Sequence, residues 1–339
     1  MRAYVVPTGC RTIDGLRRVE WPDPRPRTGQ VLVRLRAASL NRRDHAIAAG
    51  TYFGQPAARD TIPLSDGAGE VTAVGDGVTR FKPGDRVAAV FAQTPPDGPP
   101  FLAKEALGSP LDGTLTDQMA LYEDGLVSIP EGLSFEEAAC LPCAAVTAWN
   151  ALMVTGTPVK AGDTVLVLGT GGVSMFALQF ARAAGARVIA TSSSDDKLAR
   201  AIALGASEGV NYTRTPDWHK EIVKLTGGRG VDCVVEVGGV GTLEKSFDSL
   251  AAGGKACLIG VLTGRRAEIN PYALMWKQAH LHGIRVGDRD MFEQMNRAIE
   301  TNAIKPIVDR VFPFDEALAA YRYQDAGHFI GKIVITMAA

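Results

Sequence analysis

The hydrophobic positions follow two different patterns along the 339 residues. In the first part, short runs such as 31–35, 70–74 and 86–90 alternate apolar and other residues, which is typical of strands with one buried face. Turn-forming glycines and prolines, as in 82–85, separate these runs. This pattern predicts an irregular, mostly antiparallel β domain.

From about residue 161 the pattern changes to apolar runs that alternate with amphipathic segments. Segments 173–184 and 195–204 have helical spacing, and each is followed by a glycine. Near-continuous apolar strands joined by helices indicate a parallel sheet covered on both faces. We therefore predict an α/β domain with a doubly wound, six-stranded parallel sheet of the Rossmann type. Its expected strands are 164–168, 187–191, 208–211, 231–236, 255–260 and 281–286.

The last part of the chain offers a helix at 291–301 and an apolar run at 331–336 that resembles an edge strand. If that strand returns to the first domain, that domain is discontinuous. We expect a catalytic domain made of 1–140 and 287–339, and a dinucleotide-binding domain made of 141–286. The Pro-rich segment 92–113 is too long for a simple connector, and a lid, a substrate-facing loop or a subunit contact would each suit it.

Charge and composition restrict the partners. With 36 basic and 37 acidic residues, the chain has a net charge of −1, which does not favour nucleic acid or anionic lipid as a partner. The first residues become polar too soon for a signal peptide, and no segment reaches the roughly 18 apolar residues of a membrane span. Five cysteines form no regular disulfide framework. We expect a cytoplasmic protein with free thiols that acts on a small molecule.

A Gly-rich turn follows the first strand of the predicted sheet and opens a helix, which is the context expected of a dinucleotide fingerprint. Its glycines permit a tight turn and a close approach of the pyrophosphate to the helix N-terminus. Ser174 stands where the fingerprint has its third glycine, and a plain strand-to-helix turn is the alternative interpretation. The predicted contact residues are Gly169, Thr170, Gly171, Gly172 and Val173.

The end of the second strand of this sheet bears on the choice of cofactor. NAD sites usually place a carboxylate there, but this chain has Ser192 at that position. The hydroxyls of Ser192 and Ser193, together with Lys197, suit a 2′-phosphate, so NADP(H) is favoured over NAD(H). Asp195 and Asp196 count against this preference unless they serve the start of the next helix. Tyr212, at the end of the third strand, is a candidate for the adenosine pocket.

Several further motifs occur in a fixed order along nearly the full chain. They are 38–44 (ASLNRRD), 63–71 (PLSDGAGEV), 81–87 (FKPGDRV) and 141–149 (LPCAAVTAW), together with the Gly-rich turn. In these motifs the chain resembles the medium-chain dehydrogenase/reductases, specifically their zinc-free branch of quinone oxidoreductase-like and alcohol dehydrogenase-like proteins. The resemblance implies that the first domain is a catalytic domain of the GroES-like type.

Zinc-dependent members of that family bind the catalytic metal through Cys, His and Cys. The matching positions here are Asn41, Ser65 and Cys143, so only the third ligand is retained. A catalytic zinc needs three protein ligands. The Pro-rich segment, where a structural zinc site would lie, contains no cysteine. We therefore expect no metal site, and the Cys140–Cys143 spacing is more simply explained by two small residues at a helix start.

Without a Lewis acid, an activated acceptor is easier to reduce than an alcohol is to oxidise. The resemblance places the substrate at the first domain, where Asn41 would supply an amide, Tyr52 a phenol, and Asp44 an orienting group or a proton relay. It also places Thr147 at the nicotinamide ring. Asp44 as a helix cap and Tyr52 as an ordinary turn residue are the alternatives.

The resemblance further implies a set of residues that border the nicotinamide half of the cofactor, at the carboxyl ends of the later strands. They are Val237, Gly260, Val261, Arg285 and Val286. The resemblance also implies a homodimer, which an edge strand at 281–286 would form by pairing with a second copy.

Three functions stay open at this point. The first is an NADPH-dependent, zinc-independent oxidoreductase that transfers hydride to a quinone or an α,β-unsaturated carbonyl. The second is a metal-free alcohol dehydrogenase or carbonyl reductase. The third, of a different class, is an NADPH-binding sensor with little turnover.

Overall fold

A computed structural model describes residues 1–93 and 105–337 and divides the chain into two compact units. Unit 1 comprises Met1–Val146 and Gly287–Ala339, and unit 2 comprises Thr147–Val286. The predicted boundary lies after residue 140, whereas the observed boundary lies after Val146. The π-helical turn η5 (Leu141–Ala145) therefore belongs to unit 1. Within the Pro-rich segment 92–113, residues 94–104 lie outside the described residues. The roles considered for this segment therefore stay predictions.

Unit 2 contains a six-stranded sheet in which every pair of neighbours is parallel. The strand order is β12-β11-β10-β13-β14-β15, so the direction of winding reverses between β10 and β13. In such sheets the ligand crevice lies beyond the carboxyl ends of the strands at this switch point. The strands are β10 (Thr164–Leu168), β11 (Arg187–Ser192), β12 (Glu208–Asn211), β13 (Val231–Glu236), β14 (Leu250–Leu258) and β15 (His280–Gly283).

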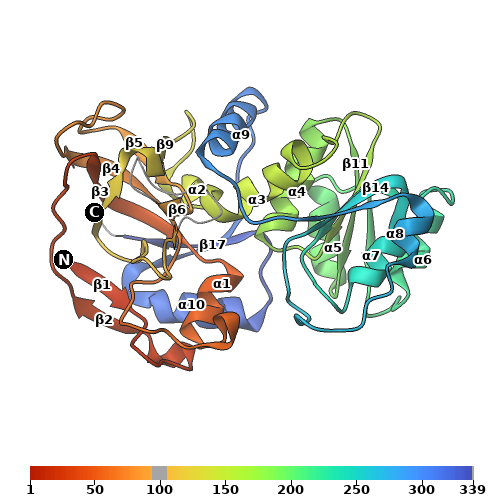
Figure 1. Ribbon diagram of the computed structural model, residues 1–339, viewed down its shortest axis with the longest axis horizontal. Coiled ribbons are helices and arrows are strands. Elements are labelled where there is room, and N and C mark those ends of the chain that lie inside the picture. The colour runs from red at the N-terminus through yellow and green to blue at the C-terminus, as the bar shows by residue number, and fades with distance from the viewer. Residues whose placement is uncertain (94–104, 338–339) are drawn as a thin grey trace. The chain divides into compact units, whose positions relative to one another are not determined.

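Helices flank this sheet (Figure 1), which confirms the predicted doubly wound α/β fold. Trp218 and Phe247, on two of the helices, share one apolar cluster with Leu166 and Val234 of the sheet. Phe180, on another helix, packs edge-to-face against Trp149 at 5.5 Å. The helices of unit 2 are α4 (Gly172–Ala183), α5 (Asp195–Ala203), α6 (Trp218–Leu225), α7 (Leu243–Ser249) and α8 (Tyr272–Lys277), and α3 (Val146–Trp149) begins at the unit boundary.

Unit 1 is built on a seven-stranded sheet that is antiparallel except for one pair, as the alternating pattern predicts. Its order is β16-β17-β3-β4-β5-β9, and β8 also pairs with β3. Two small sheets, β1-β2 and β6-β7, accompany it. Its strands are β3 (Gln30–Ser39), β4 (Asp66–Val74), β5 (Arg86–Ala89), β8 (Gln118–Tyr122), β9 (Leu126–Ser128), β16 (Val308–Pro313) and β17 (Lys332–Thr336), and the small sheets use β1 (Arg2–Val5), β2 (Arg17–Glu20), β6 (Ala92–Gln93) and β7 (Glu105–Ala106).

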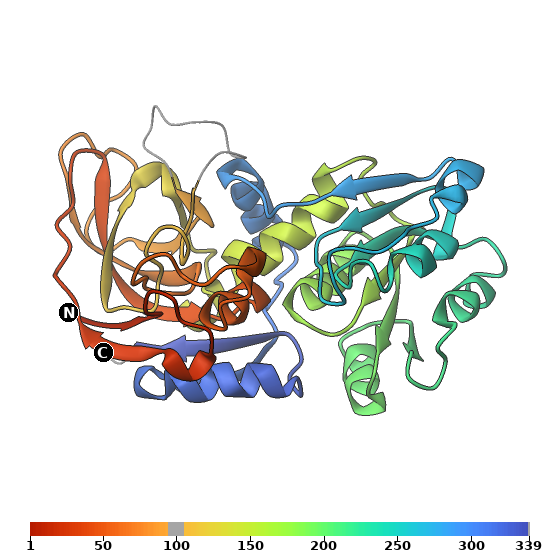
Figure 2. The same cartoon turned by 60° about the horizontal axis from the view of Figure 1, so that its bottom comes forward.

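The C-terminal segment completes this unit. Figure 2 shows β17 and α10 (Ala317–Ala326), in blue, against the red and orange N-terminal part, and β17 pairs with β3. The expectation that the last strand lies at an edge is wrong, because β16, which the pattern analysis did not predict, covers its other side. The remaining helices of unit 1 are α1 (Arg42–Ala48), α2 (Phe135–Ala138) and α9 (Arg289–Thr301).

Two predicted strands of unit 2 have different limits in the structure. β14 begins at Leu250, earlier than the predicted 255, because glycines at 253 and 254 concealed its first half. β15 ends at Gly283, before the predicted 286. Val286 has a φ of +46°, which no extended strand residue adopts, so the chain has already left the sheet there.

Candidate active site

The Gly-rich turn joins β10 to α4 in unit 2. Gly169 has a φ of +71°, a left-handed conformation that glycine adopts without strain. Gly171 is the N-cap of α4, and no side chain caps this 12-residue helix. A Cβ added at Gly169 or Gly171 would meet no atom within 4 Å. The turn therefore offers open space in front of helix N–H groups, which fits the pyrophosphate of a dinucleotide.

Ser174, which departs from the glycine fingerprint, has a structural role. Its side chain is buried, and its hydroxyl donates a 2.7 Å hydrogen bond to the carbonyl of Leu168 at the end of β10. This bond ties the first turn of α4 to the strand. Serine therefore satisfies a main-chain acceptor that glycine would leave without this partner.

The other predicted turn contacts lie in the same short segment. Thr170 is buried, and Gly172 and Val173 form the first turn of α4 with partial exposure. The turn is further held by a hydrogen bond from the N–H of Gly169 to Oγ1 of Thr191 on β11 (3.3 Å).

At the end of β11 the serines organise the start of α5. Ser192 is buried, and its Oγ accepts the N–H of Ser194 at 3.3 Å. Ser194 is the N-cap of α5, and its Oγ accepts the N–H of Lys197 at 3.4 Å. Asp195 is thus not the cap that one interpretation of the sequence allowed. Ser193 is exposed beside this turn, and Lys197 is half-buried on the first turn of α5.

A basic residue that the sequence analysis missed is paired with Asp195. The carboxylate of Asp195 forms an ion pair with Arg214 and accepts a 2.7 Å hydrogen bond from Nδ2 of Asn211. Tyr212, between Asn211 and Arg214, is 42% exposed just beyond β12. The signal that could have identified Arg214 is its position three residues after the third predicted strand of the sheet.

The residues predicted for the nicotinamide half all follow the carboxyl ends of their strands. Val237 follows β13, Gly260 and Val261 follow β14, and Arg285 and Val286 follow β15. A Cβ at Gly260 would lie 2.1 Å from the carbonyl oxygen of Val237, so this position requires glycine. These segments share the sheet edge where the Gly-rich turn lies.

A buried carboxylate, also missed by the sequence analysis, shapes this edge. Glu236 is fully buried at the end of β13 and accepts the N–H groups of Gly238 (2.7 Å) and Gly239 (3.0 Å). Its side chain also accepts the hydroxyls of Thr242 and Ser246. Four donors on one carboxylate fix the loop that follows Val237.

Unit 1 contains a cluster of polar side chains. It includes the three positions that correspond to the metal ligands of zinc-dependent family members. Asn41 precedes α1, Ser65 precedes β4, and Cys143 lies in η5. Asp66, the first residue of β4, and Lys332, the first residue of β17, complete the cluster. Ser65, Asp66 and Lys332 are at most 2% exposed.

Lys332 and Asp66 are the charged members of this cluster. Nζ of Lys332 donates to Oδ1 of Asn41 (2.6 Å) and to the carbonyl of Leu40 (2.8 Å), and lies 3.6 Å from Oδ2 of Asp66. Asp66 accepts the Ser65 hydroxyl at 2.7 Å and the N–H of Cys143 at 3.2 Å. The buried ammonium therefore has a carboxylate counter-ion and two oxygen acceptors.

This donor set does not fit a catalytic zinc ion. Such an ion takes thiolate, imidazole or carboxylate ligands, whereas Asn41 offers an amide and Ser65 a hydroxyl. Burial raises the pKa of the Cys143 thiol, and nearby Asp66 raises it further. Within residues 1–93 and 105–337, no group of three or more His, Cys, Asp or Glu side chains is arranged to hold a metal ion.

Asp44 and Tyr52 both lie close to Arg43. Asp44 is fully buried and accepts the N–H of Asn41 at 2.8 Å, as a helix-start residue does. Burial raises its pKa to about 6, although Arg43, 3.4 Å away, acts in the opposite direction. The Arg43 guanidinium lies 5.3 Å from the centre of the Tyr52 ring and 4.9 Å from that of Phe91. The three predicted unit 1 residues are thus linked through Arg43 and the start of α1.

The remaining catalytic candidate, Thr147, and the neighbouring histidine of Asp44 have different surroundings. Thr147 is buried in α3, at the first residue of unit 2. His45 is on α1 with a side chain only 12% exposed, and its Nε2 lies 2.9 Å from Oδ1 of Asp325. Burial lowers the pKa of His45. It faces α10 and does not belong to the polar cluster.

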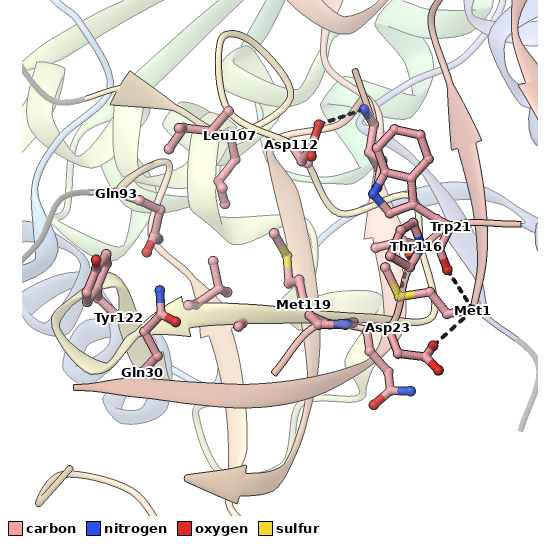
Figure 3. A pocket seen from close by; sticks show the side chains of 18 residues that line it. Met1, Trp21, Asp23, Gln30, Gln93, Leu107, Asp112, Thr116, Met119 and Tyr122 are labelled. Atoms are coloured by element: carbon pink, nitrogen blue, oxygen red, sulfur yellow. Dashed lines mark hydrogen bonds and ion pairs between the residues drawn. The ribbon is translucent and has the colours of Figure 1, made fainter. Parts of the chain in front are cut away.

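Unit 1 also contains a cavity of about 440 Å³ that is separate from this cluster (Figure 3). Trp21, Leu107 and Met119 contribute apolar surface to it, and Gln93 and Tyr122 contribute polar groups. Among its described lining residues there is none of the predicted site residues.

Comparison with known proteins agrees with this architecture. Residues 27–131 match the alcohol dehydrogenase GroES-like domain family, and residues 172–301 match the zinc-binding dehydrogenase family. A zinc-type alcohol dehydrogenase-like protein of Schizosaccharomyces pombe is 45% identical over 98% of both chains. The chain belongs to the medium-chain dehydrogenase/reductase superfamily.

Other members of the superfamily differ in name and chemistry. Human quinone oxidoreductase is 30% identical over 88% of this chain and 86% of its own. A solved structure described as an NAD-dependent alcohol dehydrogenase has a TM-score of 0.91 and 35% identity, with complete coverage of both chains. This medium-chain dehydrogenase/reductase is therefore an NAD(P)H-dependent oxidoreductase. None of the helices in the described ranges is long and apolar enough to cross a membrane.

Proposed function

We propose that this protein is an NADPH-dependent, zinc-independent reductase that transfers hydride to a quinone or an α,β-unsaturated carbonyl. The observation that carries the proposal is the polar cluster of unit 1. Where zinc-dependent relatives need thiolate and imidazole ligands, this chain has the Asn41 amide, the Ser65 hydroxyl and the Lys332 ammonium. The Asn41 amide is partly exposed and can donate a hydrogen bond that stabilises a negatively charged oxygen without a metal, and the buried Lys332 ammonium places a positive charge next to that amide.

The chemistry follows from what these groups can do. A reduced nicotinamide supplies a hydride when it is bound. Nδ2 of Asn41 donates a hydrogen bond to the oxygen of the acceptor, on which negative charge develops. Tyr52 supplies a second donor, and Arg43 beneath its ring holds it in place. A simple alcohol gains less from these donors, because oxidising it requires a base or Lewis acid that removes its hydroxyl proton.

The preference for NADPH is part of the proposal and is supported by the end of β11. Ser192 occupies the position where an NAD site usually has a carboxylate. The first carboxylate that follows it in the sequence, Asp195, is paired with Arg214. This pairing reduces the repulsion between Asp195 and a 2′-phosphate, and the Arg214 guanidinium adds positive charge next to Asp195.

The experiment is a kinetic panel of quinones, enones, aldehydes and alcohols with NADPH and with NADH. We expect turnover of quinones or enones that is faster with NADPH, and no dependence on added zinc. Turnover restricted to aldehydes and alcohols would favour a carbonyl reductase instead. Tight NADPH binding without turnover of any class would favour a sensor.

We also propose that the protein forms a homodimer through β15. This strand is the last in the order of its sheet, so one of its edges has no partner among the described strands. Large apolar side chains are exposed nearby, with Met275 at 68%, Trp276 at 74% and Leu281 at 42%. A second copy that pairs with this edge would cover both features. Sedimentation equilibrium tests the proposal, and a monomer at micromolar concentration would contradict it.

None of the five cysteines, all of which lie in the described ranges, forms a disulfide; this suits a reducing compartment, and we propose that the protein acts in the cytoplasm. Fractionation of the source cells would test this.

A further inference from the structure

A lysine buried in unit 1 contacts the amide to which the proposed function gives a catalytic role. Strands β17 and β3 are antiparallel, and Val334 pairs with Ser39. Lys332, two residues before Val334, therefore lies alongside Asn41, two residues after Ser39. Lys332 is 2% exposed. Placing an ammonium group there costs solvation free energy, and its partners must compensate for that cost.

The partners of Lys332 form a closed ring. Its Nζ donates to Oδ1 of Asn41 at 2.6 Å, and Nδ2 of Asn41 lies 3.5 Å from Oγ of Ser65. Ser65 donates to Oδ1 of Asp66 at 2.7 Å, and Oδ2 of Asp66 lies 3.6 Å from the starting ammonium. Each side chain of the ring restricts the orientation of the next.

The direction of the Asn41 amide follows from the chemistry of the ammonium. A lysine ammonium has three donors and no acceptor, so only the carbonyl oxygen of the amide can face it. The NH₂ end must therefore point the other way. One of its two N–H groups is directed to Ser65 over a long distance, and the structure gives the other no partner within the described residues. Asn41 is partly exposed, so this N–H can reach a bound molecule.

We propose that Lys332 is a positioning residue that fixes Asn41 as a hydrogen-bond donor toward the substrate oxygen and places a positive charge behind it. Through the polarised amide, the ammonium stabilises negative charge that develops on the acceptor oxygen. This proposal rests on the proposed function, since it assumes that the Asn41 amide meets a reacting oxygen.

The test is a double-mutant cycle of Lys332→Met and Asn41→Ala, assayed with NADPH and the best quinone or enone. Loss of one such donor lowers kcat about a hundredfold in other enzymes, and we expect this for Asn41→Ala. Lys332→Met should lower kcat about tenfold or more with little change in KM. Because the lysine acts through the amide, the double variant should be no slower than the slower single variant. Independent, multiplicative losses would overturn the proposal.

Lys255 provides a matched control. It is also a buried lysine, in unit 2, and its Nζ donates to the carbonyl of Thr155 at 2.7 Å. Lys255→Met removes a comparable buried ammonium away from Asn41, so it should cost stability and leave kcat unchanged. An equal fall of kcat in both lysine variants would show that the effect is only structural. If Lys332→Met does not fold, Lys332→Gln keeps a donor of similar reach without the charge, and the same comparison applies.

A stability measurement distinguishes failure of this inference from failure of the proposed function. Asn41→Asp should lower the thermal unfolding midpoint less when Lys332 is present than in the Lys332→Met or Lys332→Gln background. The reason is that the ammonium pairs with the new carboxylate. This coupling does not depend on turnover. If the wild type reduces neither quinones nor enones, the proposed function fails and the coupling alone tests the contact. No coupling would overturn the positioning role.

Discussion

Replacing Ser192 by aspartate places a carboxylate at the end of β11, where a 2′-phosphate would bind. The phosphate carries almost two negative charges at neutral pH. At a separation of about 5 Å the repulsion is about 1.7 kcal/mol even in a medium as polar as water. That energy corresponds to a roughly fifteenfold loss of NADPH affinity. Ser192 is only 3% exposed, so the effective dielectric constant is lower there and the figure is a lower bound.

Affinity for NADH should change in the other direction, because the new carboxylate can accept the ribose 2′-hydroxyl. The assay is isothermal titration calorimetry with each cofactor at one fixed ionic strength, since salt screens the repulsion. Ser192→Asn is the matched control, because it has nearly the same shape without the charge. Equal changes in both affinities, or an equal effect of aspartate and asparagine, would refute our interpretation of the strand end.

Three further predictions concern stability, pH and assembly. Ser174→Ala removes the buried 2.7 Å hydrogen bond to Leu168 and should lower the free energy of unfolding by about 1–2 kcal/mol in urea titrations; an unchanged midpoint would contradict its tie to β10. Because burial raises the pKa of Asp44 to about 6, the folded state binds more protons than the unfolded state between about pH 4 and 6. The free energy of unfolding should therefore fall by up to about 3 kcal/mol as pH rises through this range. Asp44→Asn should remove this fall, measured by unfolding curves recorded at each pH. If the free energy of unfolding of wild type and variant depended on pH in the same way, Asp44 would not be the group responsible. Leu281→Lys on the β15 edge should shift sedimentation from dimer to monomer, and an unaltered dimer would locate the interface elsewhere.

The fold could be predicted largely because its signals are local. The limits of β10 and β13 match the predicted runs, since each is a short, mainly apolar segment rich in β-branched residues and bounded by turns. The limits of β12 also match, although Val210 is its only large apolar residue. The limits of β14 were less predictable, because the glycines in its first half resemble a turn. The position of β17 inside its sheet depends on β16, whose alternation includes exposed residues and gives a weak pattern.

The candidate site was harder to predict, because it depends on side chains that are distant in sequence. The motif around Asn41 identified a candidate amide, but its partner Lys332 lies 291 residues away. Strand register brings the two together, and register cannot be read from either segment alone. A lysine that begins an apolar strand, as Lys332 does before Ile333, was the available signal. Arg214 likewise needed the structure, because only there does it meet Asp195.

The measurement that tests the central claim most directly is the zinc content of active protein together with its turnover before and after chelation. We predict substoichiometric zinc by plasma mass spectrometry, and NADPH-dependent reduction of a quinone or enone that a chelator leaves unchanged. One zinc ion per chain, with turnover lost on chelation and restored by added zinc, would contradict the account.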